Sequence, residues 1–380
     1  MKMLNCNKKW LSILVVILVT VLFHHLLAQE SADSVSFTED QGKSVKEESG
    51  EITNETFEGI ELKIKVGVIK KIKLNQIRSV TYRDEPTQYM QAKEFQESGK
   101  YTQAIELYNK IIADGRSRAI FKQHILYNIA ASYQLAGQVD DALKAYDGLL
   151  KEFPQSRYFR DAYFNKSQCA VKKDLKMAID ILDDAKVKAK QLGFEDIILE
   201  VDFRKAMLME DNNKFDDAKA IYNRLVSGAQ REPTILYRAW VGVGRIEVIN
   251  KNFNDAEKAF NEVIEKSEDF LANAGAYNGR ADCTLARSSA PDSKIYKNAL
   301  FDYLRSKVLY PVQTGEPTIE AEKATYYAGY CFEKLAQSLS AEKKKVYINN
   351  ARALYQELKE KFSRSKFISK ANERLSELGK

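Results

Sequence analysis

The stretch from Leu126 to Pro154 reads LYNIAASYQLAGQVDDALKAYDGLLKEFP and predicts two antiparallel helices. Gly137 can adopt the left-handed conformation that closes the first helix, and Pro154 cannot continue the second. Two helices that pack about 8–10 Å apart need small residues where they cross. Ala130 on the first helix and Ala142 on the second meet this need, so the stretch predicts a compact helical pair.

The same spacing recurs between residues 85 and 380, which predicts an array of helical repeats. Each second helix carries an alanine and, four positions later, a large apolar or aromatic residue. These pairs are Ala104 and Tyr108, Ala142 and Tyr146, Ala178 and Leu182, Ala218 and Tyr222, Ala256 and Phe260, Ala299 and Tyr303, and Ala351 and Tyr355. A last helix, from Ser365 to Leu378, is charged on its outer side and is expected to cap the array.

These residues resemble the tetratricopeptide repeat. That family has a small residue and an aromatic on the first helix, a glycine turn, and then alanine, aromatic and proline on the second. The resemblance covers residues 85–380 and implies a mostly α fold, an α-solenoid of antiparallel helix pairs. The second-helix alanines lie further apart than the family's usual repeat of about 34 residues, as in exported bacterial members. The family's first helices line a concave groove that binds other proteins.

Residues 50–84 predict a small β segment ahead of the array. Ile60, Leu62 and Ile64 alternate with charged residues, which is typical of a half-buried strand, and further strands are expected at Glu51–Thr56 and Ile77–Tyr82. A segment of about 35 residues is too short for independent stability, so we expect a barrel-like or meander cap on the first helical pair. The lysines form either a face for an anionic polymer or lipid headgroup or, as we prefer, a solvated side of the sheet: Lys63, Lys65, Lys70, Lys71 and Lys73.

The first 49 residues differ in character from the rest. Residues 1–29 combine a basic start with an uncharged apolar run, residues 11–27, and predict a cleaved signal peptide or an uncleaved membrane anchor. Both interpretations export the body of the chain, because the N-terminal lysines stay on the cytoplasmic side. We therefore expect a periplasmic or cell-envelope protein, tethered to the inner membrane if the signal is retained. Residues 30–49 are polar and aperiodic and predict a flexible linker.

The composition argues against catalysis and nucleic-acid binding. The net charge is +6, but no dense lysine or arginine tract occurs, so no nucleic-acid partner is expected. Two of the three histidines lie in the apolar N-terminal run, and His124 is expected to be an ordinary residue at the opening of a helix. We therefore predict that the protein is not an enzyme and needs no cofactor or metal. Cys169, Cys283 and Cys331 are expected to be buried and reduced.

The candidate partner-binding residues lie on the expected first helices. One subclass of the resembled family grips a peptide's terminal carboxylate with a charged clamp, which is not supported because Tyr127 and Ala131 stand at its positions. The candidates are mostly aromatic or neutral: Tyr127, Gln134, Phe203, Met207, Arg245, Tyr326, Tyr327 and Tyr330. Aromatic residues and arginine are enriched at the energetic centres of protein interfaces. Aromatic residues at helical spacing also form cores.

The sequence therefore predicts a non-catalytic scaffold of the bacterial cell envelope that binds peptide or helical segments of partner proteins in the groove. Two alternatives stay open. The array could pair with copies of itself as a structural component of the envelope. The chain could instead bind peptidoglycan or another polysaccharide through its aromatic residues or the basic face of the β segment.

Overall fold

The computed structural model describes residues 32–39, 44–312 and 318–379 of the chain. The expected signal or anchor, residues 1–29, lies outside these described residues. Among the helices of the described residues, none combines the length and the apolar character that a membrane span requires. The chain divides into two compact units after Ala185, here called unit 1 and unit 2, and each is described by itself.

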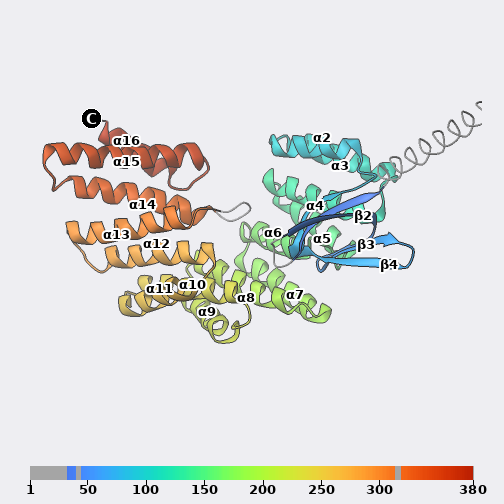
Figure 1. Ribbon diagram of the computed structural model, residues 1–380, viewed down its shortest axis with the longest axis horizontal. Helices are drawn as coiled ribbons and strands as arrows, with labels where there is room; N and C mark the ends of the chain where they lie inside the picture. The colour runs from blue at the N-terminus through green and yellow to red at the C-terminus, as the bar shows by residue number, and fades with distance from the viewer. Residues whose placement is uncertain (1–31, 40–43, 313–317, 380) are drawn as a thin grey trace, which may run out of the picture. The chain divides into compact units, whose positions relative to one another are not determined.

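Unit 1 contains a five-stranded sheet followed by helices (Figure 1). The strands are β1 (Asp33–Glu39), β2 (Ser44–Thr56), β3 (Gly59–Lys65), β4 (Val68–Lys73) and β5 (Ile77–Thr81), with the short 3₁₀ helix η2 (Leu74–Gln76) before β5. The helices are α2 (Thr87–Glu97), α3 (Tyr101–Asp114), α4 (Ala119–Leu135), α5 (Val139–Glu152), α6 (Phe159–Val171) and α7 (Leu175–Leu192), and the unit boundary falls within α7.

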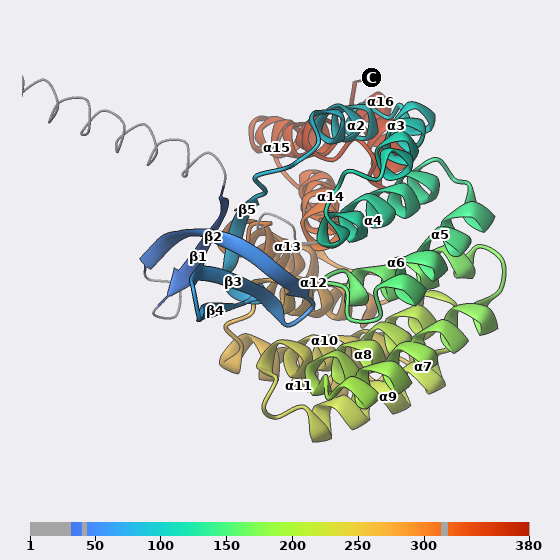
Figure 2. The same cartoon turned by 90° about the vertical axis from the view of Figure 1, so that its right-hand side faces the viewer.

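The sheet is curled rather than flat. Its strand order is β4-β3-β2-β1-β5, so β4 and β5 lie at opposite edges although only η2 joins them. A three-residue link spans roughly 14 Å at most, whereas four strand spacings in a flat sheet measure about 19 Å. The sheet must therefore curve towards a barrel. In Figure 2 the long strand β2 bends between the two halves, pairing first with β1 and then with β3.

The prediction of a flexible linker at residues 30–49 is wrong for the described part of that range. Asp33–Glu39 forms β1, and β2 begins at Ser44. Val35 and Phe37 of β1 are buried at 0% and 2% exposure and belong to one core shared by the sheet and helices α2 to α4. Burial of alternate apolar residues against distant helices therefore supplies the order that the local sequence lacks.

Unit 2 consists of antiparallel helical pairs (Figure 1). The helices are α8 (Glu195–Asp211), α9 (Phe215–Gly228), α10 (Pro233–Ile249), α11 (Phe253–Lys266), α12 (Phe270–Ala286), α13 (Ser293–Leu309), α14 (Ile319–Ala336), α15 (Ala341–Lys361) and the terminal α16 (Ile368–Leu378). The first helices α8, α10, α12 and α14 each contact the second helix that follows. Successive first helices also contact one another, α8 with α10, α10 with α12, and α12 with α14. The predicted array of antiparallel helix pairs with a small N-terminal β segment is thus confirmed.

The repeated residues hold the pairs together as the spacing predicts. Ala130 and Ala142 are fully buried where α4 and α5 pack, and Tyr146 beside them is equally buried. At the turn between these helices Gly137 has a φ of 75°, a left-handed value that glycine adopts without strain. The corresponding turn after α10 places Lys251 at a φ of 62°, where a side chain is unfavourable.

Replacing Lys251 with glycine is therefore expected to raise the free energy of unfolding by up to about 1 kcal/mol. The left-handed conformation costs a residue with a side chain about 1–2 kcal/mol, and glycine's extra freedom in the unfolded chain offsets part of that gain. Urea denaturation of the variant and of Lys258→Gly measures the effect. Lys258 lies inside α11, where glycine should cost about 1 kcal/mol. Equal losses in both variants would contradict the prediction.

Candidate interaction site on the first helices

Charged side chains bridge successive first helices of unit 2. Arg245 on α10 donates two hydrogen bonds to the carboxylate of Glu210 on α8, at 2.7 and 2.8 Å. Further along the unit, Lys323 on α14 forms an ion pair with Asp282 on α12. We call Glu210, Arg245, Asp282 and Lys323 the first-helix row.

Tyrosines of the second helices fix the acidic members of this row. The hydroxyl of Tyr222 on α9 donates to Glu210 at 2.8 Å, and the hydroxyl of Tyr303 on α13 donates to Asp282 at 2.5 Å. Both tyrosines are fully buried and occupy the repeated aromatic position of their helices. The residues that build the core of each helical pair therefore also orient the carboxylates of the row.

Burial and neighbouring charges shift the pKa values of the first-helix row in opposite directions. Burial alone would raise the pKa of Glu210, but the charge and hydrogen bonds of Arg245 lower that pKa overall. Burial alone would lower the pKa of Lys323, and the charges of Asp282 and Glu320 raise it overall. The side chains of Arg245 and Lys323 keep 26% and 21% of their surface exposed, so both reach solvent while held in place.

Two of the predicted partner-binding residues lie on α4 of unit 1. Tyr127 stacks on Tyr158 with ring centroids 4.1 Å apart, and burial raises the pKa of Tyr127 to about 12. Gln134 accepts a hydrogen bond from the hydroxyl of Tyr146 at 2.6 Å. Both residues are half-buried and are engaged in contacts within unit 1.

Three further predicted residues lie on α8 and α10. Phe203 and Met207 are half-buried and pack against the core between α8, α9 and α10. Arg245 belongs to the first-helix row. The structure brings Met207 and Arg245 to adjacent first helices of one unit, as the repeat spacing implies.

The predicted tyrosine cluster on α14 separates into buried and accessible members. Tyr326 is only 5% exposed and stacks on Phe367 at 5.2 Å, so it is a core residue. Tyr327 and Tyr330 are half-buried and approach each other edge to face at 6.4 Å. Tyr327 also stacks on Tyr303 at 5.5 Å, which joins it to the tyrosine that orients Asp282.

Sequence reasoning missed three of the four members of the first-helix row. Glu210, Asp282 and Lys323 are single charged residues with no local motif around them. A signal was present for Asp282, because it follows Arg245 by about one repeat length and so occupies a comparable place on the next first helix. Which charges pair between successive helical pairs depends on packing that the repeat pattern alone does not specify.

Comparison with known proteins identifies one of the helical pairs. Residues 125–156, which contain most of α4 and all of α5, match the family model of the tetratricopeptide repeat. This pair is therefore similar to a tetratricopeptide repeat. No curated protein sequence matches the chain.

Solved structures of low sequence identity are also similar. A tetratricopeptide repeat protein from Parabacteroides merdae shares 16% identity, with 78% of this chain and 100% of that chain covered and a TM-score of 0.48. The apo form of the quorum sensor NprR from B. thuringiensis shares 12% identity over 77% of this chain and 86% of that chain, with a TM-score of 0.45. Tetratricopeptide repeats are commonly scaffolds for protein–protein interaction and are generally non-enzymatic.

His124 lies inside α4, just before the matched residues 125–156, and not at the opening of the helix as predicted. Its Nε2 is 2.8 Å from Glu55 Oε2, and its Nδ1 is 2.7 Å from the hydroxyl of Tyr158. Glu55 comes from β2, is also bonded by the hydroxyl of Tyr82 at 2.8 Å, and forms an ion pair with Arg157. The side chains of Glu55 and His124 are 0% and 5% exposed, so this cluster joins sheet to repeat and is closed to substrate.

The predicted basic face of the sheet is partly neutralised. Lys70 forms ion pairs with Glu48 at 2.9 Å and with Glu39 at 3.4 Å, and Lys71 forms one with Glu61 at 2.8 Å. These contacts reduce the charge that an anionic polymer or headgroup would meet. They favour the interpretation of the lysines as the solvated side of the sheet.

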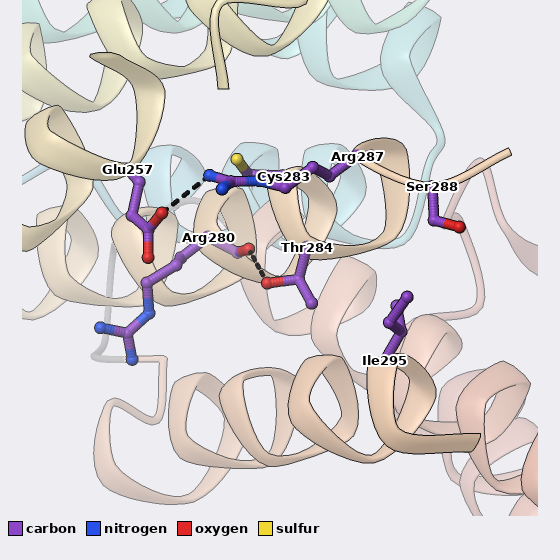
Figure 3. A pocket seen from close by; sticks show the side chains of 7 residues that line it. All are labelled: Glu257, Arg280, Cys283, Thr284, Arg287, Ser288 and Ile295. Atoms are coloured by element: carbon purple, nitrogen blue, oxygen red, sulfur yellow. Dashed lines mark hydrogen bonds and ion pairs between the residues drawn. The ribbon is translucent and has the colours of Figure 1, made fainter. Parts of the chain in front are cut away.

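A pocket of about 420 Å³ lies between α11, α12 and α13 of the tetratricopeptide-like array (Figure 3). Arg287 at its wall is bonded to Glu257 at 2.7 Å, and Arg280 is bonded to Asp302 at 2.8 Å. Its arginines are therefore already paired with carboxylates of the protein. Cys283 in the same wall is 2% exposed, and burial raises the pKa of its thiol, which disfavours the reactive thiolate.

Metal ligation and thiol reactivity place separate requirements on the described residues. No group of three or more histidine, cysteine or acidic side chains in residues 32–39, 44–312 and 318–379 is placed to hold a metal ion. Cys169, Cys283 and Cys331 are buried and unpaired, as predicted. Burial raises the pKa of the Cys331 thiol to about 12.

Proposed function

We propose that this protein is a non-catalytic interaction scaffold of a bacterial cell envelope that holds peptide or helical segments of partner proteins against its first helices. The first-helix row carries the proposal. Its ion pairs connect α8 to α10 and α12 to α14, while the side chains of Arg245 and Lys323 remain partly exposed. A surface that is fixed before binding loses less conformational entropy when a partner docks.

The envelope location is supported by the N-terminal sequence. Residues 1–29 combine lysines with an uncharged apolar run, which is typical of an export signal or membrane anchor. Export would place the repeat array where it meets other envelope proteins. Fractionation of cells that produce the full-length chain tests this part, because recovery in the cytosolic fraction alone would contradict it.

Site-specific photo-cross-linking in the full-length chain tests the binding surface. A photo-reactive amino acid at Met207 samples the first helices, and the same amino acid at Lys258 on α11 is the control, since Lys258 has a 79% exposed side chain on a second helix. We expect a defined partner to cross-link at Met207 and not at Lys258. A synthetic segment of that partner should compete with the cross-link. Equal capture at both positions would argue against a first-helix binding site.

A further inference from the structure

We propose that the turn between β3 and β4 inserts into the surface of a membrane that contains anionic lipids. The site is the hairpin tip, defined as Lys63, Lys65, Val66, Val68 and Ile69. It belongs to unit 1, whereas the first-helix row belongs to unit 2. The inference therefore adds a membrane contact to the proposed scaffold and does not depend on how the scaffold binds its partner.

The apolar side chains of the hairpin tip are uncovered. Val66 is 98% exposed, and Val68 and Ile69 are 50% and 53% exposed. Apolar surface that stays in water contributes nothing to folding through the hydrophobic effect. The turn itself needs only Gly67, whose φ of 78° is left-handed, and turns of this kind usually carry polar neighbours. The stability of the fold therefore does not account for an apolar tip.

The hairpin tip lies at the far end of β3 from a contact that attaches the sheet to the helices. At the attached end, the backbone amide of Phe57 donates to the carbonyl oxygen of Gln155 at 3.1 Å, and Thr56 forms a β-bridge with Ser156. The seven residues of β3, Gly59–Lys65, span about 20 Å. The tip is thus held well away from this contact, and β4 beside it is an edge strand of the sheet (Figure 2).

Two lysines of the hairpin tip lie beside its apolar side chains. In the strand register Lys63 is opposite Ile69, and Lys65 is opposite Val68. Both lysines are exposed, and among the described residues neither side chain forms an ion pair or a hydrogen bond. The tip therefore presents positive charge and apolar surface together.

The acidic side chains next to these lysines are paired with other cations. Glu51 on β2 lies opposite Lys63 but forms an ion pair with Arg83 at 3.3 Å. The one acidic residue of the β3–β4 hairpin, Glu61, is paired with Lys71 at 2.8 Å. The hairpin contains five lysines, so an excess of positive charge remains at its tip.

This combination fits a bilayer surface better than a protein partner. Anionic headgroups attract basic side chains that lie close to the membrane surface. Valine and isoleucine can enter the acyl boundary below the headgroups, while a lysine stem lies along it and its ammonium group stays at the headgroups. A stable protein interface buries about 800 Å² on each partner, far more than three aliphatic side chains at a turn provide.

The attraction to a membrane is confined to this end of the hairpin. Lys70, further along β4, is paired with Glu48 at 2.9 Å, so the middle of the sheet remains a solvated face. The export signal or anchor expected at residues 1–29 would bring the sheet to a membrane. The hairpin tip would then form a second contact with that membrane.

A fluorescent amino acid placed at Val66 in the full-length chain tests the insertion. Vesicles of phosphatidylcholine, alone or mixed with phosphatidylglycerol, carry brominated acyl chains that quench an inserted fluorophore. We expect the equilibrium constant for insertion to be at least about tenfold higher on the anionic vesicles and to fall as salt is added. The same amino acid at Met90 on α2, which is 50% exposed, is the control and should stay unquenched.

Charge-removing variants locate the attraction. Lys63→Gln and Lys65→Gln should each lower the equilibrium constant for insertion by about fivefold, and together by about twentyfold. Lys110→Gln combined with Lys151→Gln removes the same charge from exposed positions on α3 and α5 and should change nothing. The N-terminal apolar run is present in every variant, so it cannot account for a difference between them.

The outcomes separate this inference from the proposed function. A fluorophore at Val66 that is quenched no more than one at Met90, or equally on neutral and anionic vesicles, would overturn the inference. Equal losses in the two pairs of lysine variants would do the same. Capture of a protein by a photo-reactive amino acid at Val66, without quenching by lipid, would assign the tip to a protein partner instead. Cross-linking at Met207 tests the scaffold function independently of these results.

Discussion

Replacing Glu55 with alanine is expected to lower the free energy of unfolding of unit 1 by about 3–5 kcal/mol, the typical cost of breaking a buried ion pair. The side chain of Glu55 is 0% exposed and lies between His124 and Arg157. Its removal leaves the half-buried Arg157 charge without its carboxylate. Hydrogen exchange at the amides of β2 and α4 measures the effect within unit 1, and urea denaturation measures it for the whole chain.

Glu51→Gln is the matched control. Glu51 also lies on β2 and forms an ion pair with Arg83, but its side chain is 45% exposed. That variant should change the free energy of unfolding by less than about 0.5 kcal/mol. If Glu55→Ala is no more destabilising than Glu51→Gln, the contacts of Glu55 with His124 and Arg157 do not stabilise the packing of the sheet against the helices.

The same residue should make unit 1 sensitive to acid. Burial opposes ionisation of Glu55, but His124 and Arg157 outweigh it and hold its pKa below the ordinary 4.5. A carboxylate with a lowered folded-state pKa contributes stability that is present above the unfolded value and is lost as pH falls through the folded-state pKa. Stability should therefore fall below about pH 4.5, and the fall should be shallower in Glu55→Gln.

Replacing Gly279 with alanine is the second large expected effect, a loss of about 1–3 kcal/mol in the free energy of unfolding. Alanine normally improves a helix by about 1 kcal/mol over glycine. A Cβ at Gly279 would lie 2.3 Å from the ring of Phe260, however, which is fully buried. The steric cost therefore exceeds the gain in helix propensity.

Gly148 on α5 provides the control, since a Cβ there would have nothing within 4 Å. Gly148→Ala should raise the free energy of unfolding by about 0.5–1 kcal/mol. Thermal and urea denaturation of both variants should thus move in opposite directions. A stabilised Gly279→Ala protein would show that Phe260 adapts and that the helical crossing is less tightly packed than described.

The helical pairs could be predicted from sequence because their determinants are local and repeat. Ala142 and Tyr146 sit four residues apart, both are fully buried, and the same pattern marks each later second helix. Strand β1 could not be predicted in this way. Its Val35 and Phe37 are only two apolar residues, and Asp33 at its start is bound by Arg118, which lies 85 residues away in the chain.

The candidate site was predictable only in part for a similar reason. Arg245 stood out as a basic residue on a first helix, and the structure places it in the first-helix row. Its partner Glu210 comes from another helical pair, so no local pattern connects the two. Tyr326 was predicted to bind a partner but is buried. The sequence could not distinguish the two roles, because an aromatic residue at helical spacing is equally suited to a core.

The position of β1 has a mechanical consequence. The strand lies between β2 and β5, and the carboxylate of Asp33 at its start is held by Arg118 next to α4 and by the backbone amides of Ile52 and Arg83. A force applied to the chain ahead of residue 32 would therefore act along β1 and shear its hydrogen bonds to both β2 and β5. It would not peel a single edge strand from the sheet. If the N-terminal segment is held at a membrane, tension would pass through Arg118 into the helices, and the scaffold could bear load without unravelling from its tethered end.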